Sequence, residues 1–138
     1  MDYRETNRHV IAGFRAGDEL PGMHRERLLL LTTTGRRSGN PHTTPMMFHR
    51  EDGRMFVIAS NVGAPNDPEW CLNLRADPAV TIEVGDEPGS PPYAATASVL
   101  EGEDRAAVWA RIAELYPFFV DHQTKAPREI PVVELTPV

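Results

Sequence analysis

The chain of 138 residues is long enough to bury one hydrophobic core and too short for two ordinary domains. Its 41% hydrophobic and 25% charged residues are typical of a globular domain, which we expect to be a monomer or a homodimer. The 20 acidic residues exceed the 14 basic ones and give a net charge of -6, which disfavours nucleic-acid binding.

An amphipathic helix is the first predicted element. Residues 2–16 place Val10 and Phe14 on one apolar face among charged side chains, and Gly17 follows as a helix stop. We assign residues 1–20 to this N-terminal helical segment. The early charges resemble no signal peptide, so we expect a cytoplasmic protein. The helix face is small, so packing on the domain is favoured over peripheral contact with a membrane.

Six strands are predicted further along the chain. They are apolar or alternating runs bounded by turn residues, and they cover residues 28–34, 42–49, 55–60, 80–84, 93–100 and 130–135. The Asp52–Gly53 pair suits a tight hairpin between the second and third strands. The proline-rich segment 88–92 predicts an exposed loop before the fifth strand.

Two further helices are predicted between these strands. Residues 67–69 have the order of an N-cap, a first-turn proline and a first-turn acid, so a helix should run to about residue 76. Residues 104–116 repeat apolar side chains at helical spacing. Pro117 should end that helix, and a short turn should follow to about residue 124.

Strands joined by hairpin-length connections and accompanied by short helices favour an α+β fold, a small antiparallel barrel with helices packed on it. The chain contains neither G-x-G-x-x-G nor G-x-x-x-x-G-K. The sequence therefore excludes the usual dinucleotide-binding and P-loop signatures.

The turn at residues 34–40 is the first candidate site. Arg36 and Arg37 can present fork-shaped donors to a phosphate, and Ser38 adds a hydroxyl. His42 adds a donor on the adjoining strand. The alternative is an ordinary hairpin loop with solvated arginines.

Two other segments could carry chemistry. The loop at residues 59–68 has small and turn-forming residues, which let a flat ring or an anion approach the backbone, although a plain connector would look similar. Residues 109–123 gather aromatic side chains that could face a planar substrate or pack in the core. Within them, the polar groups of Tyr116 and His122 need an explanation.

Metal-dependent and hydrolytic chemistry are not favoured. The five histidines lack the short spacings of a zinc site, so we expect no metal. Cys71 is the single cysteine and has no partner for an internal disulfide. A triad can be drawn from Ser60, His122 and Asp121, but no G-x-S-x-G motif supports it.

Three motifs together resemble the deazaflavin-dependent nitroreductase family, the branch of split-barrel flavin-binding proteins that uses coenzyme F420 in actinobacteria. They are T-T-G-R-x-[ST]-G at residues 33–39, A-S-x-x-G-A at 59–64 and W-x-x-N-L at 70–74, and the likeness covers nearly the whole chain. The resemblance implies one deazaflavin-binding domain over residues 1–138. Its fold would be a small antiparallel split β-barrel of about six strands with short flanking helices, the barrel part beginning at residue 27.

The resemblance also implies an F420-dependent oxidoreductase that passes a hydride to a small organic acceptor, namely a quinone, an enone or lactone, or a nitroaromatic. The phosphate and acidic tail of the coenzyme would be held by Arg36, Arg37, Ser38, Gly39 and His42. The deazaflavin ring would be lined by Pro45, Met47, Ala59, Ser60, Asn61, Gly63, Ala64, Trp70 and Asn73. The acceptor would be faced by Tyr116, Phe119 and His122, with Tyr116 and Ser60 as the catalytic candidates.

Some positions depart from the family pattern, and two alternatives stay open. His42 stands where arginine is usual, which weakens one anionic contact near neutral pH. Phe119 and His122 replace tyrosines of the nitroimidazole-activating members. One alternative is an FMN enzyme of the pyridoxamine-phosphate-oxidase-like group. The other is a non-catalytic carrier of F420, haem or an apolar ligand. The tandem arginines favour F420, and Tyr116 favours an enzyme.

Overall fold

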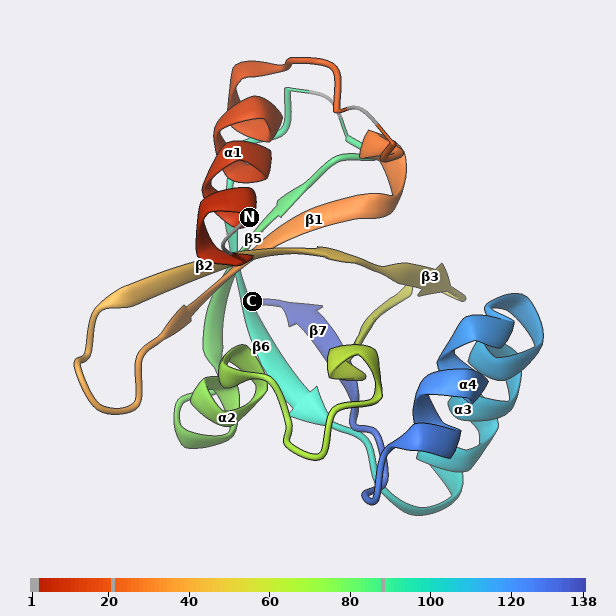
Figure 1. Cartoon of the computed structure of the whole chain (residues 1–138). Coiled ribbons are helices and arrows are strands. Elements are labelled where there is room, and N and C mark those ends of the chain that lie inside the picture. Colours follow the sequence, from red (N-terminus) through yellow and green to blue (C-terminus); the bar gives the residue numbers. More distant parts are fainter. Residues whose placement is uncertain (1–2, 21, 88) are drawn as a thin grey trace.

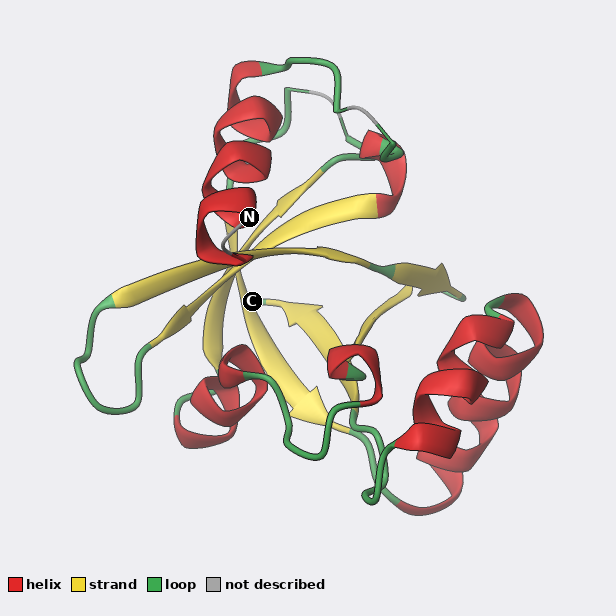
Figure 2. Cartoon of the chain, viewed as in Figure 1, coloured by secondary structure: helices red, strands yellow, loops and turns green. Residues whose placement is uncertain are grey.

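A computed structural model of the protein describes residues 3–20, 22–87 and 89–138. The helices within these residues are α1 (Tyr3–Ala16), α2 (Glu69–Ala76), α3 (Gly102–Leu115) and α4 (Pro117–Lys125), with short 3-10 turns η1 (Arg25–Arg27) and η2 (Asn61–Gly63). The strands are β1 (Leu28–Thr34), β2 (Pro41–Met47), β3 (His49–Glu51), β4 (Arg54–Ile58), β5 (Ala79–Val84), β6 (Tyr93–Val99) and β7 (Val132–Pro137). Figure 2 shows helices and strands mixed along the chain, and the predicted α+β class is confirmed.

In the described residues, the strands form one antiparallel sheet in the order β2-β1-β5-β6-β7-β4-β3. The two edge strands, β2 and β3, are neighbours in the chain and are separated only by Phe48. The sheet must therefore curl until its edges approach each other, and Figure 1 shows the resulting half-barrel. The predicted antiparallel barrel with flanking helices is thus confirmed.

The predicted strand at 42–49 is wrong in one respect, because it is broken into β2 and β3. Phe48 is 8% exposed and its N–H donates to the carbonyl of Arg27, 3.1 Å away. This bond extends the register of β2 with β1 by one residue, and the strand breaks after it, because His49 pairs with Phe56 of β4 instead. The Asp52–Gly53 hairpin is confirmed, since both residues have positive φ, 51° and 76°.

The predicted turn after Pro117 is also wrong, because residues 117–125 form α4. Tyr116 has φ -132° and ψ 74°, which ends α3, and Pro117 then occupies the first turn of the next helix. Proline is well suited to that position because a first-turn residue donates no intrahelical bond. The same residue therefore stops one helix and starts another.

Two smaller expectations have mixed outcomes. The N-terminal helix ends at Ala16 before Gly17, as predicted. Asp67 does not cap α2, since Pro68 is the N-cap and the Asp67 carboxylate instead accepts from Arg128 at 2.6 Å. Expectations for residues 1, 2 and Pro88 lie outside the described residues. In the described part of the chain, no helix is both long and apolar enough to cross a membrane.

The core has two parts. Leu31, Val57 and Ile82 belong to a cluster inside the curl of the sheet, and each is fully buried. Phe56 and Ile112 belong to a second cluster, where α3 and α4 pack on the outside of β4 and β7. This second cluster fixes the position of α4 relative to the sheet.

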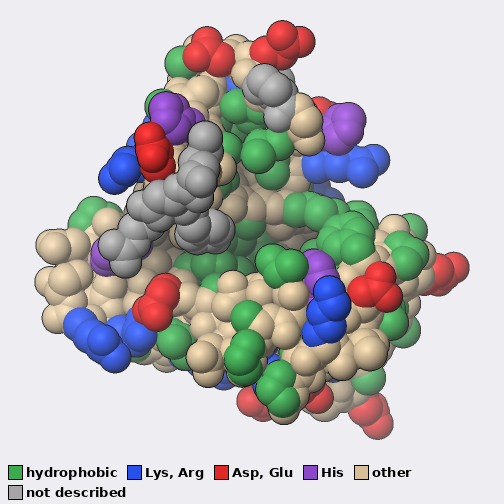
Figure 3. Space-filling model, in the orientation of Figure 1, with side chains coloured by type: hydrophobic (Ala, Val, Ile, Leu, Met, Phe, Trp, Pro, Cys, Tyr) green, Lys and Arg blue, Asp and Glu red, His purple; other side chains and the backbone are tan. Residues whose placement is uncertain are grey.

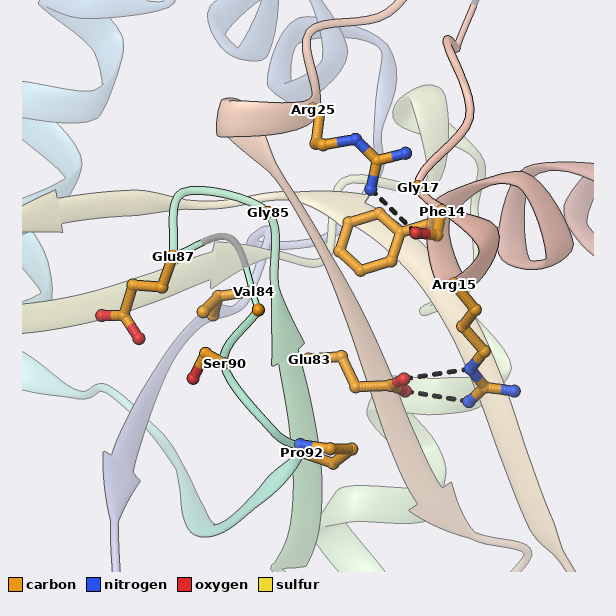
Figure 4. Close-up of a pocket in the computed structure, with 11 residues that line it drawn as sticks. Phe14, Arg15, Gly17, Arg25, Glu83, Val84, Gly85, Glu87, Ser90 and Pro92 are labelled. Carbon is orange, nitrogen blue, oxygen red and sulfur yellow. Dashed lines mark hydrogen bonds and ion pairs between the residues drawn. The ribbon is translucent and has the colours of Figure 1, made fainter.

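A cavity of about 420 Å³ lies where the end of α1 meets β5 (Figure 4). Arg15 makes a two-bond ion pair with Glu83 across it, at 3.0 and 2.8 Å. Arg25 donates to the carbonyl of Phe14 at 2.8 Å and stacks over its ring. These charged groups tie α1 to the sheet, and the predicted site residues lie elsewhere.

Candidate functional site

The first part of the site is the arginine hairpin, residues 34–42, which joins β1 to β2. The N–H of Gly35 donates to the carbonyl of Asn40 at 2.8 Å, and the Asn40 N–H donates to the Ser38 hydroxyl at 3.1 Å. A β-carbon on Gly35 would lie 2.7 Å from both Ser38 Oγ and His42 Nε2. A larger residue at position 35 would therefore displace these two side chains from the turn.

The arginine hairpin is held against α2 by Asn73. The amide oxygen of Asn73 accepts from both the backbone N–H and the guanidinium of Arg36, at 3.2 and 2.9 Å. Its amide nitrogen donates to Thr33 at 3.3 Å, and Asn73 is only 4% exposed. Asn73 therefore positions Arg36.

Arg36 also binds a carboxylate. Its guanidinium donates to Glu69 Oε2 at 2.7 Å, and the Glu69 side chain is 79% exposed. The bond and charge of Arg36 lower the pKa of Glu69, and Arg37 and His42 add smaller effects in the same direction. Arg37 and His42 are exposed. The tip of the hairpin is thus a local positive region in an acidic protein.

The second part of the site is the loop at residues 59–68, which has an uncommon backbone. Asn61, Val62 and Gly63 have consecutive positive φ angles of 48°, 56° and 82°. The left-handed region is unfavourable for a β-branched residue such as Val62. Asn61 stabilises the loop through its side-chain bond to the carbonyl of Asn66, 3.1 Å long.

Arg128 holds this loop from the other side. Its guanidinium donates to the carbonyls of Ala59, Ser60 and Ala64 at 3.2, 2.9 and 3.2 Å, and to Asp67 at 2.6 Å. The side chains of Arg128 and Asp67 are 15% and 18% exposed. A single planar cation therefore satisfies several loop acceptors at once.

The third part is α4, which contacts the loop closely. A β-carbon on Gly63 would lie 2.8 Å from the backbone carbonyl of His122. Beside this contact, His122 Nδ1 and Ser60 Oγ are 3.1 Å apart. Two of the predicted site residues, 62 positions apart in the chain, are thereby brought into one hydrogen bond.

Tyr116 lies at the start of α4 and makes a second such bond. Its hydroxyl is 2.9 Å from Nδ1 of His49 on β3. Its ring makes edge contacts with Phe118 and Phe119. Phe119 is 7% exposed and belongs to the second core cluster, so its packing is largely structural.

The remaining predicted residues lie on β2 and α2. Pro45 pairs with Leu30 of β1 and is half-buried. Met47 packs against the cluster that contains Phe119, whereas Trp70 packs against the inner cluster. Trp70 lies in the first turn of α2, which directly follows the 59–68 loop, and Met47 ends β2.

The three parts lie along one side of the curled sheet (Figure 1). The arginine hairpin contacts α2, and the 59–68 loop precedes α2 and contacts α4. Met47, at the end of β2, packs against the cluster that includes Phe119 of α4. Figure 3 shows a hollow in this face, walled by hydrophobic side chains, and basic side chains near the end of the hairpin. The arrangement suits a long ligand with an anionic end and an apolar, planar end.

Some contacts of the site were not predicted from the sequence, and one predicted contact is missing. Among the described residues, Ser60 and His122 share a hydrogen bond, but no bond joins Asp121 to either of them. The Ser60–His122–Asp121 triad considered from the sequence is therefore not formed. His49 and Arg128 were given no role from the sequence. Each acts on a partner more than sixty positions away, so no local pattern could have indicated the contact.

A family model described as F420H(2)-dependent quinone reductase matches residues 3–137. An F420H(2)-dependent quinone reductase of Mycobacterium tuberculosis (strain ATCC 25618 / H37Rv) is 34% identical over 137 residues. That match covers 97% of this chain and 84% of the relative.

Two solved structures agree with these sequence matches. An F420-H2-dependent reductase is 37% identical with a TM-score of 0.68, covering 83% of this chain and 99% of that one. A structure described as a domain-swapped dimer is 35% identical with a TM-score of 0.70, covering 93% of this chain and 95% of that one.

Proposed function

The chain belongs to the F420H(2)-dependent quinone reductase family, and we propose that it is an oxidoreductase that reduces a quinone at the site between the arginine hairpin, the 59–68 loop and α4. Its cofactor is coenzyme F420. The observation that carries the location of the site is the contact of Arg36 with a carboxylate at 2.7 Å. This contact means that the guanidinium is already oriented to receive an anion.

The chemistry of the donors fits the anionic part of the coenzyme. Arg36 is positioned by Asn73, and the exposed Arg37 stands beside it. Ser38, Gly39 and His42 complete the turn. Paired guanidinium groups bind phosphate through short, charge-assisted hydrogen bonds. We assign the phosphate and acidic tail of F420 to this end.

The other end offers a surface for the deazaflavin ring. Small side chains and a tightly turned backbone allow close approach of a planar group. The residues we assign to the ring are Pro45, Met47, Ala59, Ser60, Asn61, Gly63, Ala64, Trp70 and Asn73. Of these, Ala59, Ser60, Gly63 and Asn73 are buried, and Asn73 acts mainly by orienting Arg36.

Tyr116 and His122 are assigned to the acceptor, and Phe119 supports them from the second core cluster. When bound, reduced F420 supplies a hydride, so the protein need provide no nucleophile or metal. The chain's own residues must orient the acceptor, exclude water and stabilise the oxyanion that develops on it. The Tyr116 hydroxyl and the Ser60–His122 pair are the polar groups suited to that last task.

The finer identity of the acceptor and the assembly are further proposals. On the T-T-G-R-x-[ST]-G motif and the curled sheet, we place the chain in the wider deazaflavin-dependent nitroreductase family of split-barrel proteins. Enones, lactones and nitroaromatics are then additional acceptors. A monomer or a homodimer is consistent with the buried core of the single chain.

Titration of the purified protein with F420 and, in parallel, FMN tests the cofactor, and reoxidation of the reduced coenzyme by menadione tests the activity. We expect tight F420 binding, weak FMN binding and menadione-dependent reoxidation. A preference for FMN would contradict the cofactor assignment. F420 binding without turnover of any acceptor in a broad panel would instead make the protein a carrier.

A further inference from the structure

We propose that His49 controls proton delivery to the acceptor through Tyr116, within a chain of four residues that we call the relay: Tyr116, His49, Glu51 and Arg111. The inference rests on the proposed function, because it assigns a proton donor to that reaction. His49 and Glu51 were not among the predicted site residues. His49 is a positioning residue in this proposal, since Tyr116 is the group that faces the acceptor.

The relay is continuous from the aromatic wall of the site to solvent. The Tyr116 hydroxyl lies 2.9 Å from His49 Nδ1, and His49 Nε2 lies 3.5 Å from Glu51 Oε1. Arg111 makes an ion pair with the second carboxylate oxygen of Glu51. The side chains of His49 and Glu51 are 11% and 19% exposed, whereas that of Arg111 is 43% exposed.

Three separate elements converge to build the relay. His49 and Glu51 lie two positions apart on β3 and therefore share a face of the strand. Arg111 comes from α3, and Tyr116 from the junction of α3 and α4. The imidazole stacks on Phe56 at 6.4 Å and meets the Tyr116 ring edge-on at 5.5 Å, which fixes its orientation.

Three titratable or charged side chains surround the imidazole of His49: a phenol, a carboxylate and a guanidinium. The Tyr116 hydroxyl is hydrogen-bonded to Nδ1 and the Glu51 carboxylate to Nε2. Arg111 is ion-paired with Glu51 and so affects the ring through that carboxylate. In the doubly protonated ring, Nε2–H points to the Glu51 carboxylate. Nδ1–H can then donate to the phenol oxygen and leave the phenol O–H free for the acceptor.

The proton balance of quinone reduction requires such a donor. A hydride brings two electrons and one hydrogen nucleus to the acceptor, whose carbonyl oxygen must gain one further proton. In the relay, the Tyr116 O–H bond breaks as the new O–H bond forms on the acceptor. The Nδ1–H bond of His49 breaks as the phenol is restored, and the neutral imidazole keeps its proton on Nε2. Solvent later returns one proton to the free Nδ1 through the Tyr116 hydroxyl, once the product has left the site.

The first test compares the protonation of His49, measured in the protein without coenzyme, with the pH profile of turnover, measured with reduced F420. Nitrogen NMR of histidine-labelled protein reports which ring nitrogens of His49 carry protons at each pH. We expect the pH midpoint of His49 protonation to coincide with a pH midpoint of menadione turnover. Glu51→Gln replaces the carboxylate at Nε2 with an amide, and any change in the first midpoint should be matched by the same change in the second. A His49 ring with one protonation state across the pH range in which turnover changes would overturn the proposal.

The second test distinguishes two roles of His49: binding the Tyr116 hydroxyl and supplying it with a proton. In His49→Asn, an amide can occupy the position of Nδ1 and bind Tyr116, but it cannot gain and lose a proton at neutral pH. We expect kcat with menadione to fall by about 100-fold, the usual scale of general acid catalysis, with unchanged F420 affinity. Tyr116→Phe should lower kcat to a similar degree and should not be additive with His49→Asn.

His24→Asn is a matched control, because His24 also lies two residues from a carboxylate, 3.5 Å from Glu26, but is 73% exposed. It should leave kcat and its pH profile unchanged. Wild-type kcat and pH profile in His49→Asn would overturn the relay while leaving the reductase intact. If the wild-type protein failed to bind F420, the proposed function would be overturned instead, and the relay would have no reaction to which it could deliver a proton.

Discussion

The carboxylate of Glu69 lies 2.7 Å from the guanidinium of Arg36, on the exposed side of the arginine hairpin. Asn73 binds the same guanidinium from the buried side at 2.9 Å. Arg36 is therefore held between a neutral, buried acceptor and a charged, exposed one. An incoming phosphate can replace the exposed partner without disturbing the buried one.

Glu69→Gln should consequently tighten F420 binding, because the coenzyme no longer competes with a carboxylate. An exposed pair of this kind is weak, so the expected gain in affinity is about threefold. Fluorescence titration measures it. Glu114→Gln, which changes the net charge equally at an exposed position of α3, should leave the affinity unchanged. Weaker binding in Glu69→Gln would show that Glu69 supports the coenzyme site.

The effect of Glu69 should depend on pH in a defined direction. Arg36 lowers the pKa of Glu69, so the carboxylate stays charged and paired throughout the neutral range. The pair is lost as the pH falls through this lowered value, below the ordinary range of a glutamate. The affinity difference between wild type and Glu69→Gln should therefore be complete at neutral pH and disappear in acid. A difference that increases in acid would exclude competition by the carboxylate.

The two arginines should respond differently to replacement. Arg37→Ala should weaken F420 binding and leave the thermal unfolding midpoint unchanged, because Arg37 is exposed. Arg36→Ala should weaken binding and also lower the free energy of unfolding by about 1 kcal/mol, since its bonds to Asn73 join the hairpin to α2. Arg8→Ala, an exposed arginine of α1, is the control for loss of charge. Unchanged affinity in both variants would remove the phosphate role from the hairpin.

The arginine hairpin could be predicted from the sequence because its signals are local. Adjacent glycines and arginines within seven residues specify both the turn and its charge. Most strands were predictable for the same reason, since apolar or alternating runs are local patterns, but the break at Phe48 was not. Pro117 shows the limit of local rules: the residue stops α3, and it also starts α4, and only packing against the sheet favours the second helix.

The partners of the site residues could not be predicted in this way. Tyr116 and His49 are 67 positions apart, and Arg128 and Ser60 are 68 apart. Such pairs are set by the curl of the sheet and by the docking of α4, which depend on the whole core. A histidine on a short strand and an arginine before a strand carry no distinguishing local pattern.

Arg128 should be essential for the shape of the 59–68 loop. Arg128→Ala leaves several loop carbonyls and the Asp67 carboxylate without their donor, and we expect a loss of about 3 kcal/mol in the free energy of unfolding. Denaturant titration measures this loss. Amide hydrogen exchange at Gly63 and Ala64, whose N–H groups bond within the loop, should accelerate.

Arg128→Lys provides the matched comparison. An ammonium keeps the charge opposite Asp67 but cannot reproduce the planar fork that reaches several carbonyls. We expect it to recover part of the stability and little of the exchange protection. Full recovery of both would mean that charge alone, and not the geometry of the guanidinium, maintains the loop.

Gly63 should be required for the contact between the loop and α4. Gly63→Ala places a methyl group 2.8 Å from the carbonyl of His122 at a residue with φ of 82°. Gly53→Ala imposes a similar backbone strain at φ 76°, but its side chain would meet open space. Subtracting the two losses in unfolding free energy isolates the clash, which should amount to about 1–3 kcal/mol. Because α4 must move to relieve it, Gly63→Ala should also lower menadione turnover, whereas Gly53→Ala should not. Equal losses of stability and equal turnover in the two variants would show that α4 can move away from the added methyl group without loss of free energy. The 59–68 loop would then not determine the position of α4.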